Sequence, residues 1–163
     1  MSMKTKHNTT TKIKLMIIGI GNEARADDGV GLYIAEQLRR EYRDALKILK
    51  HRGGTTNLIH EWEGFSKVVI CDAVHSGKKA GFVYRFDYPK DEFPEEIFKF
   101  SIHTFSLGQV LELAKLLNHL PKEVIIYGIE GKFFTTGEKL SPEVRESADC
   151  VIERIKGEIN RRR

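Results

Sequence analysis

Two patterns of apolar residues alternate along the chain. Short continuous apolar runs are typical of strands buried on both faces of a parallel sheet, and stretches with an apolar residue every three to four positions predict amphipathic helices. The alternation of the two predicts a three-layer α/β/α domain, a mostly parallel twisted sheet of about five strands flanked by helices with right-handed crossovers. We expect strands at 13–20, 45–50, 67–73, 81–86 and 123–129, and helices at 28–42, 55–61, 104–118 and from 141 onward.

Several segments allow more specific structural predictions. Residues 81–86 alternate apolar and polar, which favours an antiparallel or edge strand. Ser141-Pro142-Glu143 has the residue types of a helix start, with a cap, a proline and an acid. Residues 87–101 hold two prolines and several phenylalanines, and either a substrate-docking lip or ordinary core remains open for them. In the helix at 104–118, the inner face is expected to hold Leu107, Val110, Leu111, Ala114 and Leu117.

Length and charge limit the possible classes of protein. The chain has 163 residues, enough for one domain with one core. The net charge of +4 comes from the two ends of the chain, because six basic residues lie in 1–12 and 161–163. Residues 13–160 carry a net charge of −2. We expect a disordered tail at 1–12, a single α/β domain at 13–160 and a basic tail at 161–163. The sequence has no stripe of interleaved basic and aromatic residues, the pattern that would indicate nucleic-acid binding.

No segment of the sequence has the composition of a membrane or export signal. The longest apolar run is far too short to span a bilayer. Residues 1–12 are polar and lack the apolar stretch of a secretory signal peptide. The expectation is a cytoplasmic protein that is not bound to a membrane. A monomer is expected as well, since no long exposed apolar stripe is evident.

The segment after the first strand, Gly19-Ile20-Gly21-Asn22 followed by Asp27-Asp28, carries the main candidate chemistry. A dinucleotide-binding turn is disfavoured, because the third glycine of that motif is missing and two acids stand where a pyrophosphate would bind. The second strand also ends in basic residues, with no acid for a ribose. We therefore expect no nucleotide cofactor. Of the two acids, one is expected to cap the helix and the other to act as a ligand.

Two more residues of suitable chemistry lie near predicted element ends, Asp72 near a strand end and His103 before a helix. Each residue alone has an ordinary structural explanation. Because carboxyl ends of parallel strands share one edge of the sheet, one acid of the Asp27-Asp28 pair is expected to lie near Asp72 and His103. Carboxylates and imidazole are donors to transition metals, and three protein ligands leave coordination positions open.

The motifs resemble a known family. Gly19-x-Gly21-Asn22 with Asp27-Asp28-Gly29-x-Gly31 is similar to the opening signature of the [NiFe]-hydrogenase maturation endopeptidases. Further similar segments follow in the same order at Gly53-Gly54-Thr55, Asp72-Ala73, Ser101-Ile102-His103, Gly128-Ile129-Glu130 and Leu140-Ser141-Pro142. The resemblance covers residues 13–157 and implies the same three-layer α/β fold.

The resemblance implies an endopeptidase that removes the C-terminal extension of a [NiFe]-hydrogenase large-subunit precursor after nickel insertion. It also implies that Asp28, Asp72 and His103 form a catalytic and metal-contacting triad, with the nickel carried by the substrate. Gly53, Gly54 and Thr55 would line the cleft for the substrate tail, and Asn22 is a candidate to hold the oxyanion. Hydrolysis driven by the metal and hydrolysis driven by a carboxylate, as in an aspartyl protease, both remain open.

Three positions depart from the family pattern, and they bear on substrate preference. Arg52 stands where an acid is common, Asn57 where a glycine is common, and Gly131 where a proline is common. Two other functions remain as alternatives: a non-catalytic nickel-binding chaperone module that uses the same triad, and a phosphate-binding domain that uses the glycine turn. Binding of RNA by the arginine tail is a weaker possibility, which would show a steep salt dependence.

Overall fold

The computed structural model describes residues 14–52, 57–98, 106–137 and 139–161. The strands are β1 (Leu15–Ile20), β2 (Lys47–His51), β3 (Lys67–Val74), β4 (Val83–Tyr88) and β5 (Glu123–Glu130), and the α-helices are α1 (Val30–Tyr42), α2 (Leu58–Glu61), α3 (Leu107–Leu116) and α4 (Pro142–Asn160). Short 3-10 helices lie at η1 (Ala26–Gly29), η2 (Arg43–Ala45) and η4 (Glu95–Phe98).

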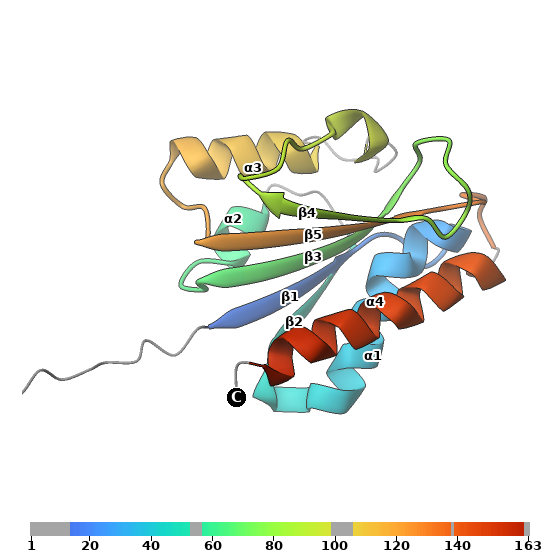
Figure 1. The fold of residues 1–163 in the computed structure, drawn as a ribbon, viewed down its shortest axis with the longest axis horizontal. Coiled ribbons are helices and arrows are strands. Elements are labelled where there is room, and N and C mark those ends of the chain that lie inside the picture. The colour runs from blue at the N-terminus through green and yellow to red at the C-terminus, as the bar shows by residue number, and fades with distance from the viewer. Residues whose placement is uncertain (1–13, 53–56, 99–105, 138, 162–163) are drawn as a thin grey trace, which may run out of the picture.

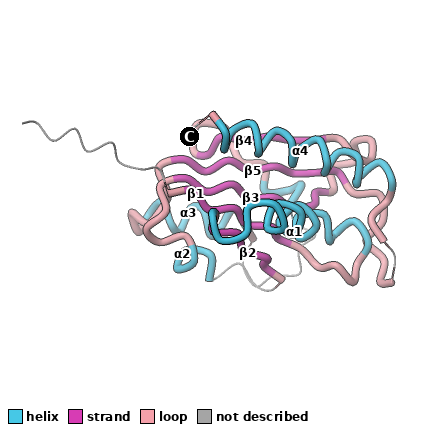
Figure 2. Tube along the Cα trace, turned by 90° about the horizontal axis from the view of Figure 1, so that it is seen from below, coloured by secondary structure: helices cyan, strands magenta, loops and turns pink. Residues whose placement is uncertain are grey.

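The strands form one five-stranded sheet in the order β2-β1-β3-β5-β4. All neighbours pair in parallel except β4, which runs antiparallel to β5 at the sheet edge. Helices α1 and α4 cover one face, and α2 and α3 cover the other (Figure 1). Viewed from below, α1 and α4 cross the near face of the sheet (Figure 2). The three-layer α/β/α prediction and the antiparallel edge strand are therefore confirmed.

Alternate side chains of the central strands enter two separate cores. Ile18, Ile20 and Ile70 pack with α2 and α3, and Ile17 and Val69 pack with α1 and α4. All residues of β3 are buried, as its unbroken apolar run predicts. None of the described helices is both long and apolar enough to cross a membrane.

Helix α1 lies unusually close to the sheet because two glycines face each other. A Cβ atom at Gly19 would lie 2.1 Å from the carbonyl oxygen of Gly31, and one at Gly31 would lie 2.3 Å from the carbonyl oxygens of Ile20 and Cys71. Only hydrogen fits at either position. Gly31 thus supplies the close helix–strand contact for which the sequence offered no third glycine near Ala24.

Several element ends differ from their sequence predictions. The helix predicted to begin at 28 starts with η1, and α1 itself begins at Val30. Helix α3 begins after Ser106, whose hydroxyl accepts the N–H of Gln109 in a capping box. Because α3 ends at Leu116, Leu117 is not part of its inner face and is 53% exposed, so that prediction was wrong.

The phenylalanines of the segment after β4 are part of the core where the structure describes them. Phe98 is buried, and Phe93 packs against the same core with the two rings stacked 4.8 Å apart. Of the two alternatives, these two side chains therefore favour ordinary core. Phe100 lies outside the described residues.

A buried ion-pair network holds α4 to the sheet at the end away from η1. The ammonium of Lys67 in β3 lies 3.0 Å from Glu158 and 3.3 Å from Glu123. Glu158 also accepts a hydrogen bond from the hydroxyl of Tyr127. Burial alone would raise the pKa of Glu158, but the hydrogen bond and charge of Lys67 outweigh it and lower that pKa below 4.5.

This network predicts an acid-dependent loss of stability. A carboxyl whose pKa is depressed by folding stabilises the protein above its unfolded-state pKa, and that contribution is lost as the pH falls through the folded-state value. Glu158→Gln should lower the free energy of unfolding by about 2 kcal/mol at neutral pH, and the difference from wild type should shrink below about pH 4.5. Thermal unfolding from pH 3 to 8 measures it, with the exposed Glu153→Gln as control. Parallel curves for wild type and Glu158→Gln would contradict this.

Candidate functional site

The loop between β1 and α1 folds back onto the end of its own strand. Gly21 has φ +149°, and a Cβ atom there would lie 1.9 Å from the carbonyl oxygen of Asp28. That carbonyl accepts the N–H of Asn22 at 3.1 Å, and the N–H of Gly21 donates to His51 of β2 at 3.2 Å. The backbone at Asp28 is therefore fixed directly beside the carboxyl ends of β1 and β2.

The turn into η1 contains a residue in an unfavourable backbone conformation. Ala26 has φ +51°, in the left-handed region that residues other than glycine seldom adopt. The next residue is held in place, since the N–H of Asp27 donates to the carbonyl oxygen of Phe133 at 3.0 Å. Contacts with the loop after β5 thus stabilise a turn that the local sequence does not favour.

Asp27 is fully buried and serves as a structural anchor. Its carboxylate accepts the N–H groups of Lys132 and Phe133 at 2.8 and 3.0 Å, and both the N–H and the hydroxyl of Ser141. It therefore joins η1 to the loop after β5 and to the start of α4. The prediction that one of the two acids caps the helix was wrong, since no side chain caps η1 or α1. Ser141 occupies the predicted N-cap position of α4 but directs its hydroxyl to Asp27.

Asp28 has the opposite environment, although it is the next residue. Its side chain is only 6% exposed, yet no group among the described residues donates a hydrogen bond to its carboxylate. Burial raises its pKa, and the positive charge of Arg25 offsets this only partly. Burying a carboxylate without hydrogen-bond donors costs free energy, and a bound cation would offset that cost.

Asp72 lies within β3, two residues before the strand ends at Val74, rather than at its end. It is 2% exposed, and one carboxylate oxygen accepts the N–H of Ala73 at 2.8 Å. By alternation it shares the α3 face with Ile70 and Val74. Its register partner in β5 is Gly128, which places no side chain beside it.

The structure brings Asp28 and Asp72 to the same edge of the sheet. Strands β1 and β3 are parallel neighbours with Gly19 opposite Cys71, and η1 packs against β3. The predicted partners His103, Gly53, Gly54 and Thr55 lie outside the described residues. Within the described ranges no group of three or more potential metal ligands is present. The structure thus places Asp28 and Asp72 at one edge, while the position of His103 and the triad roles of all three residues stay predictions.

Asn22, predicted to bind substrate, has a visible role in shaping the loop. Its side chain is exposed, and the amide oxygen accepts the N–H of Ala24 at 2.9 Å. This contact is the asparagine turn typical of such residues. Among the described residues no acceptor pairs with its side-chain amide hydrogens, and a contact with substrate stays a prediction.

Arg52, which stands where the family commonly has an acid, has a partner that the sequence did not reveal. The guanidinium of Arg52, which follows β2, forms a bidentate pair with Glu23 in the loop after β1, at 2.7 to 3.0 Å. The hydrogen bond with Arg52 lowers the pKa of Glu23. The pair is exposed and links the loops that follow β1 and β2, at the rim of the site.

Glu130, which precedes the departure at Gly131, also has a structural role. Glu130 is buried at the end of β5 and accepts the N–H groups of Ser76 and Gly77, each at 3.0 Å, and the hydroxyl of Ser76 at 2.7 Å. It holds the loop that follows β3. No local pattern could have identified this role, because the partners are more than fifty residues away.

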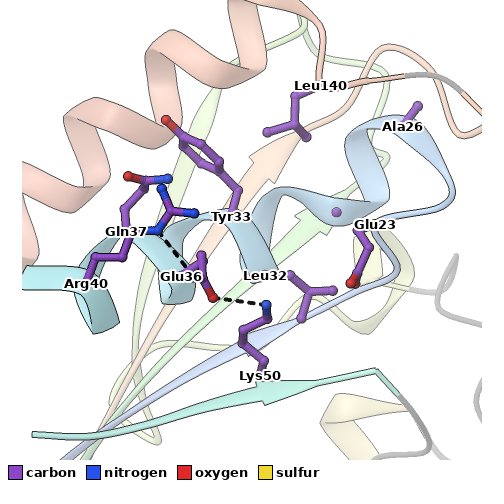
Figure 3. A pocket seen from close by; sticks show the side chains of 10 residues that line it. Glu23, Ala26, Leu32, Tyr33, Glu36, Gln37, Arg40, Lys50 and Leu140 are labelled. Carbon is purple, nitrogen blue, oxygen red and sulfur yellow. Dashed lines mark hydrogen bonds and ion pairs between the residues drawn. The ribbon is translucent and has the colours of Figure 1, made fainter. Parts of the chain in front are cut away.

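A cavity of about 290 Å³ lies beside η1, between α1 and the end of β2 (Figure 3). Its lining is apolar near Leu32 and Leu140 and charged near Glu36, Arg40 and Lys50. Neither Asp28 nor Asp72 lines it, although Ala26 and Gly29 of η1 do. The cavity therefore adjoins the candidate site from the α1 side of the sheet.

Comparisons with known proteins identify the family of the chain. A family model described as hydrogenase maturation protease matches residues 32–158. The chain is 29% identical over 145 residues to the hydrogenase expression/formation protein HupD of Thiocapsa roseopersicina, an alignment that covers 86% of this chain and 65% of that protein. The chain thus spans just under two thirds of that relative's length.

Solved structures show the same fold. The [NiFe] hydrogenase maturation protease HybD from Thermococcus kodakarensis superposes with a TM-score of 0.66 at 27% identity, covering 88% of this chain and 97% of that one. The hydrogenase maturating endopeptidase HybD from Escherichia coli superposes with a TM-score of 0.73 at 19% identity, covering 91% and 93%. At that identity, the second match supports the fold alone.

Proposed function

The chain belongs to the hydrogenase maturation protease family, and on that premise we propose that it removes the C-terminal extension of a [NiFe]-hydrogenase large-subunit precursor after nickel insertion. The observation that carries the proposal is the contrast between Asp27 and Asp28. One carboxylate is saturated by donors, while the other is nearly buried, lies at the same sheet edge as Asp72 and meets no donor among the described residues.

The nickel is part of the substrate in this proposal. Asp28, Asp72 and His103 contact the ion that the precursor carries, and so place the scissile peptide at the sheet edge. Imidazole is an ordinary ligand of nickel, and the two carboxylates, which are harder ligands, would complete a coordination begun by the ligands of the substrate. The buried carboxylate of Asp28 supports the proposal, since a bound cation would supply the compensation that Arg25 gives only partly and that no hydrogen-bond donor gives among the described residues. A precursor without nickel lacks this anchor and is a poor substrate.

Two routes to peptide hydrolysis fit the same residues. The metal can polarise the scissile carbonyl as a Lewis acid, or Asp28 or Asp72 can accept a proton from the attacking water. The raised pKa of Asp28 brings that carboxyl closer to the range in which a general base works. Asn22 and the backbone amides near Gly21 are the proposed donors to the oxyanion.

The first test compares nickel-loaded and nickel-free precursor, each treated with wild-type protein and with His103→Ala. We expect cleavage only in the reaction of loaded precursor with wild-type protein. The shift of the large subunit on a gel and mass spectrometry measure the cleavage. Circular dichroism checks that the variant is folded. Equal cutting of loaded and nickel-free precursor would contradict the role of nickel. Association with the loaded precursor without any cutting would favour the non-catalytic chaperone module instead.

A further inference from the structure

The backbone of β2 is open along one side of the sheet. The N–H of Gly21 donates to the carbonyl oxygen of His51, so His51 turns its backbone groups toward β1, and by alternation Leu49 does as well. The backbone groups of Ile48 and Lys50 therefore point away from β1. Over the part of the chain that the structure describes, no group pairs with them, and β2 forms the margin of the sheet (Figure 2).

The opposite edge of the sheet is different. The N–H of Glu130 donates to Phe82, so the backbone groups of Val83, Arg85 and Asp87 point outward from β4. The chain itself covers part of that edge, because Asp91 accepts the N–H of Asp87 at 2.7 Å and donates its own N–H to Asp87 at 2.8 Å. Proteins commonly protect edge strands in this way. At β2, no such protection exists among the described residues.

The open edge leads to the candidate site. The last residue of β2, His51, lies opposite Ile20, and η1 with Asp28 follows Ile20 by a short loop. A strand added beside β2 would therefore end close to the edge that holds Asp28 and Asp72. Main-chain pairing holds an extended peptide largely without regard to its sequence, and side-chain pockets at alternate positions add the specificity.

The cavity beside η1 provides such a pocket. Lys50 directs its side chain to the α1 face, where its ammonium donates to Glu36 at 3.0 Å, and Arg40 donates to the other oxygen of Glu36 at 3.3 Å (Figure 3). Both oxygens of Glu36 are thus occupied, while Lys50 and Arg40 retain further N–H donors. The cavity is also lined by Glu23, whose two carboxylate oxygens accept from Arg52, so the remaining charged groups offer mainly the N–H donors of Lys50 and Arg40. A side chain of an added strand beside Lys50 would lie near these donors, so an acidic or amide side chain fits best.

We propose that the outer edge of β2 binds the precursor's C-terminal segment as an added strand, with an acidic or amide side chain of that segment in the cavity between α1 and β2. This inference rests on the proposed function, since it takes the precursor tail as the peptide. In this proposal the backbone groups of Ile48 and Lys50 position the substrate, a role that no side-chain motif indicates.

The first experiment uses wild-type protein and nickel-loaded precursors whose C-terminal segment is supplied by chemical ligation, with one N-methyl amide at each successive residue. Strand pairing predicts that kcat/KM falls at least about tenfold at every second position and little at the positions between. A loss without alternation would overturn the proposal. Replacing the acidic or amide residue of the precursor tail that is proposed to enter the cavity with lysine should raise KM as well.

The second experiment changes the edge itself. Ile48→Pro removes an outward N–H from β2, and Val83→Pro removes an outward N–H from β4; both side chains pack partly buried against the same core. We expect KM for the loaded precursor to rise at least about tenfold only in Ile48→Pro, with similar melting temperatures for both variants. Equal effects would overturn the proposal. If Ile48→Pro does not fold, the N-methyl series decides.

The failure of the proposed function is distinguishable from the failure of this inference. If wild type leaves the unmodified loaded precursor uncut, the proposed protease function fails. The binding of the N-methyl series is then measured by fluorescence anisotropy with labelled protein. Alternation of the affinity would still support strand addition at β2, and no alternation or no binding would overturn it.

Discussion

Asp28→Asn is expected to lower kcat/KM for the nickel-loaded precursor by at least about 100-fold while the protein stays folded. Asparagine has nearly the same size but lacks the charge that would contact the nickel or accept a proton. The fold should not suffer, because no described residue donates to the Asp28 carboxylate and burial already raises its pKa. We therefore expect a melting temperature equal to that of wild type or slightly higher.

Asp44→Asn is the matched control, since Asp44 is an exposed carboxylate in η2, outside the candidate site. It should leave both kcat/KM and the melting temperature unchanged. Cleavage of the loaded precursor by Asp28→Asn at the wild-type rate would exclude Asp28 from the reaction. A large drop in melting temperature would show instead that this carboxylate is structural.

Asp27→Asn, one residue earlier, should have the opposite effect and lower the free energy of unfolding by about 3 kcal/mol. The carboxylate accepts bonds from three backbone N–H groups and from the hydroxyl of Ser141 in a fully buried site. An amide nitrogen in place of one oxygen cannot accept them and would face other donors. For a chain of this size, the melting temperature should fall by about 10 °C.

Urea denaturation followed by circular dichroism measures this change, and Ser141→Ala provides a graded control. That variant loses only the hydroxyl and keeps the backbone N–H bond to Asp27. Its expected cost is about 1 kcal/mol. If Asp27→Asn unfolds at the same urea concentration as wild type, Asp27 is not the anchor of η1, and the contrast between the two neighbouring acids is lost.

Much of the fold could be predicted from short-range patterns. The apolar run of β3 indicated a strand buried on both faces, and the alternation at 81–86 indicated the antiparallel edge strand that the structure has at Val83–Tyr88. Ends of elements were less certain, because they depend on contacts outside the local sequence. Leu117 fits the helical period but lies beyond the last turn of α3, where it is exposed.

The candidate site could be predicted only in part. The sequence located Asp28 and Asp72 at one edge of the sheet, since parallel strands bring their carboxyl ends together. The residue types alone did not distinguish Asp27 from Asp28, because two adjacent acids look alike until their donors are known, and only the family resemblance indicated Asp28. The donors of Asp27 come from Lys132, Phe133 and Ser141, more than a hundred residues along the chain.

By itself, the sequence determined the α/β layering and the glycine and carboxylate motifs, because periodicity and backbone requirements are local properties. The tertiary structure alone decided which carboxylate is saturated and which is available, that Glu23 pairs with Arg52, and that Glu130 holds the loop after β3. It also decided that the β2 edge is open beside the site. These features depend on hydrogen bonds between residues far apart in the chain, which form only when the sheet and helices have packed.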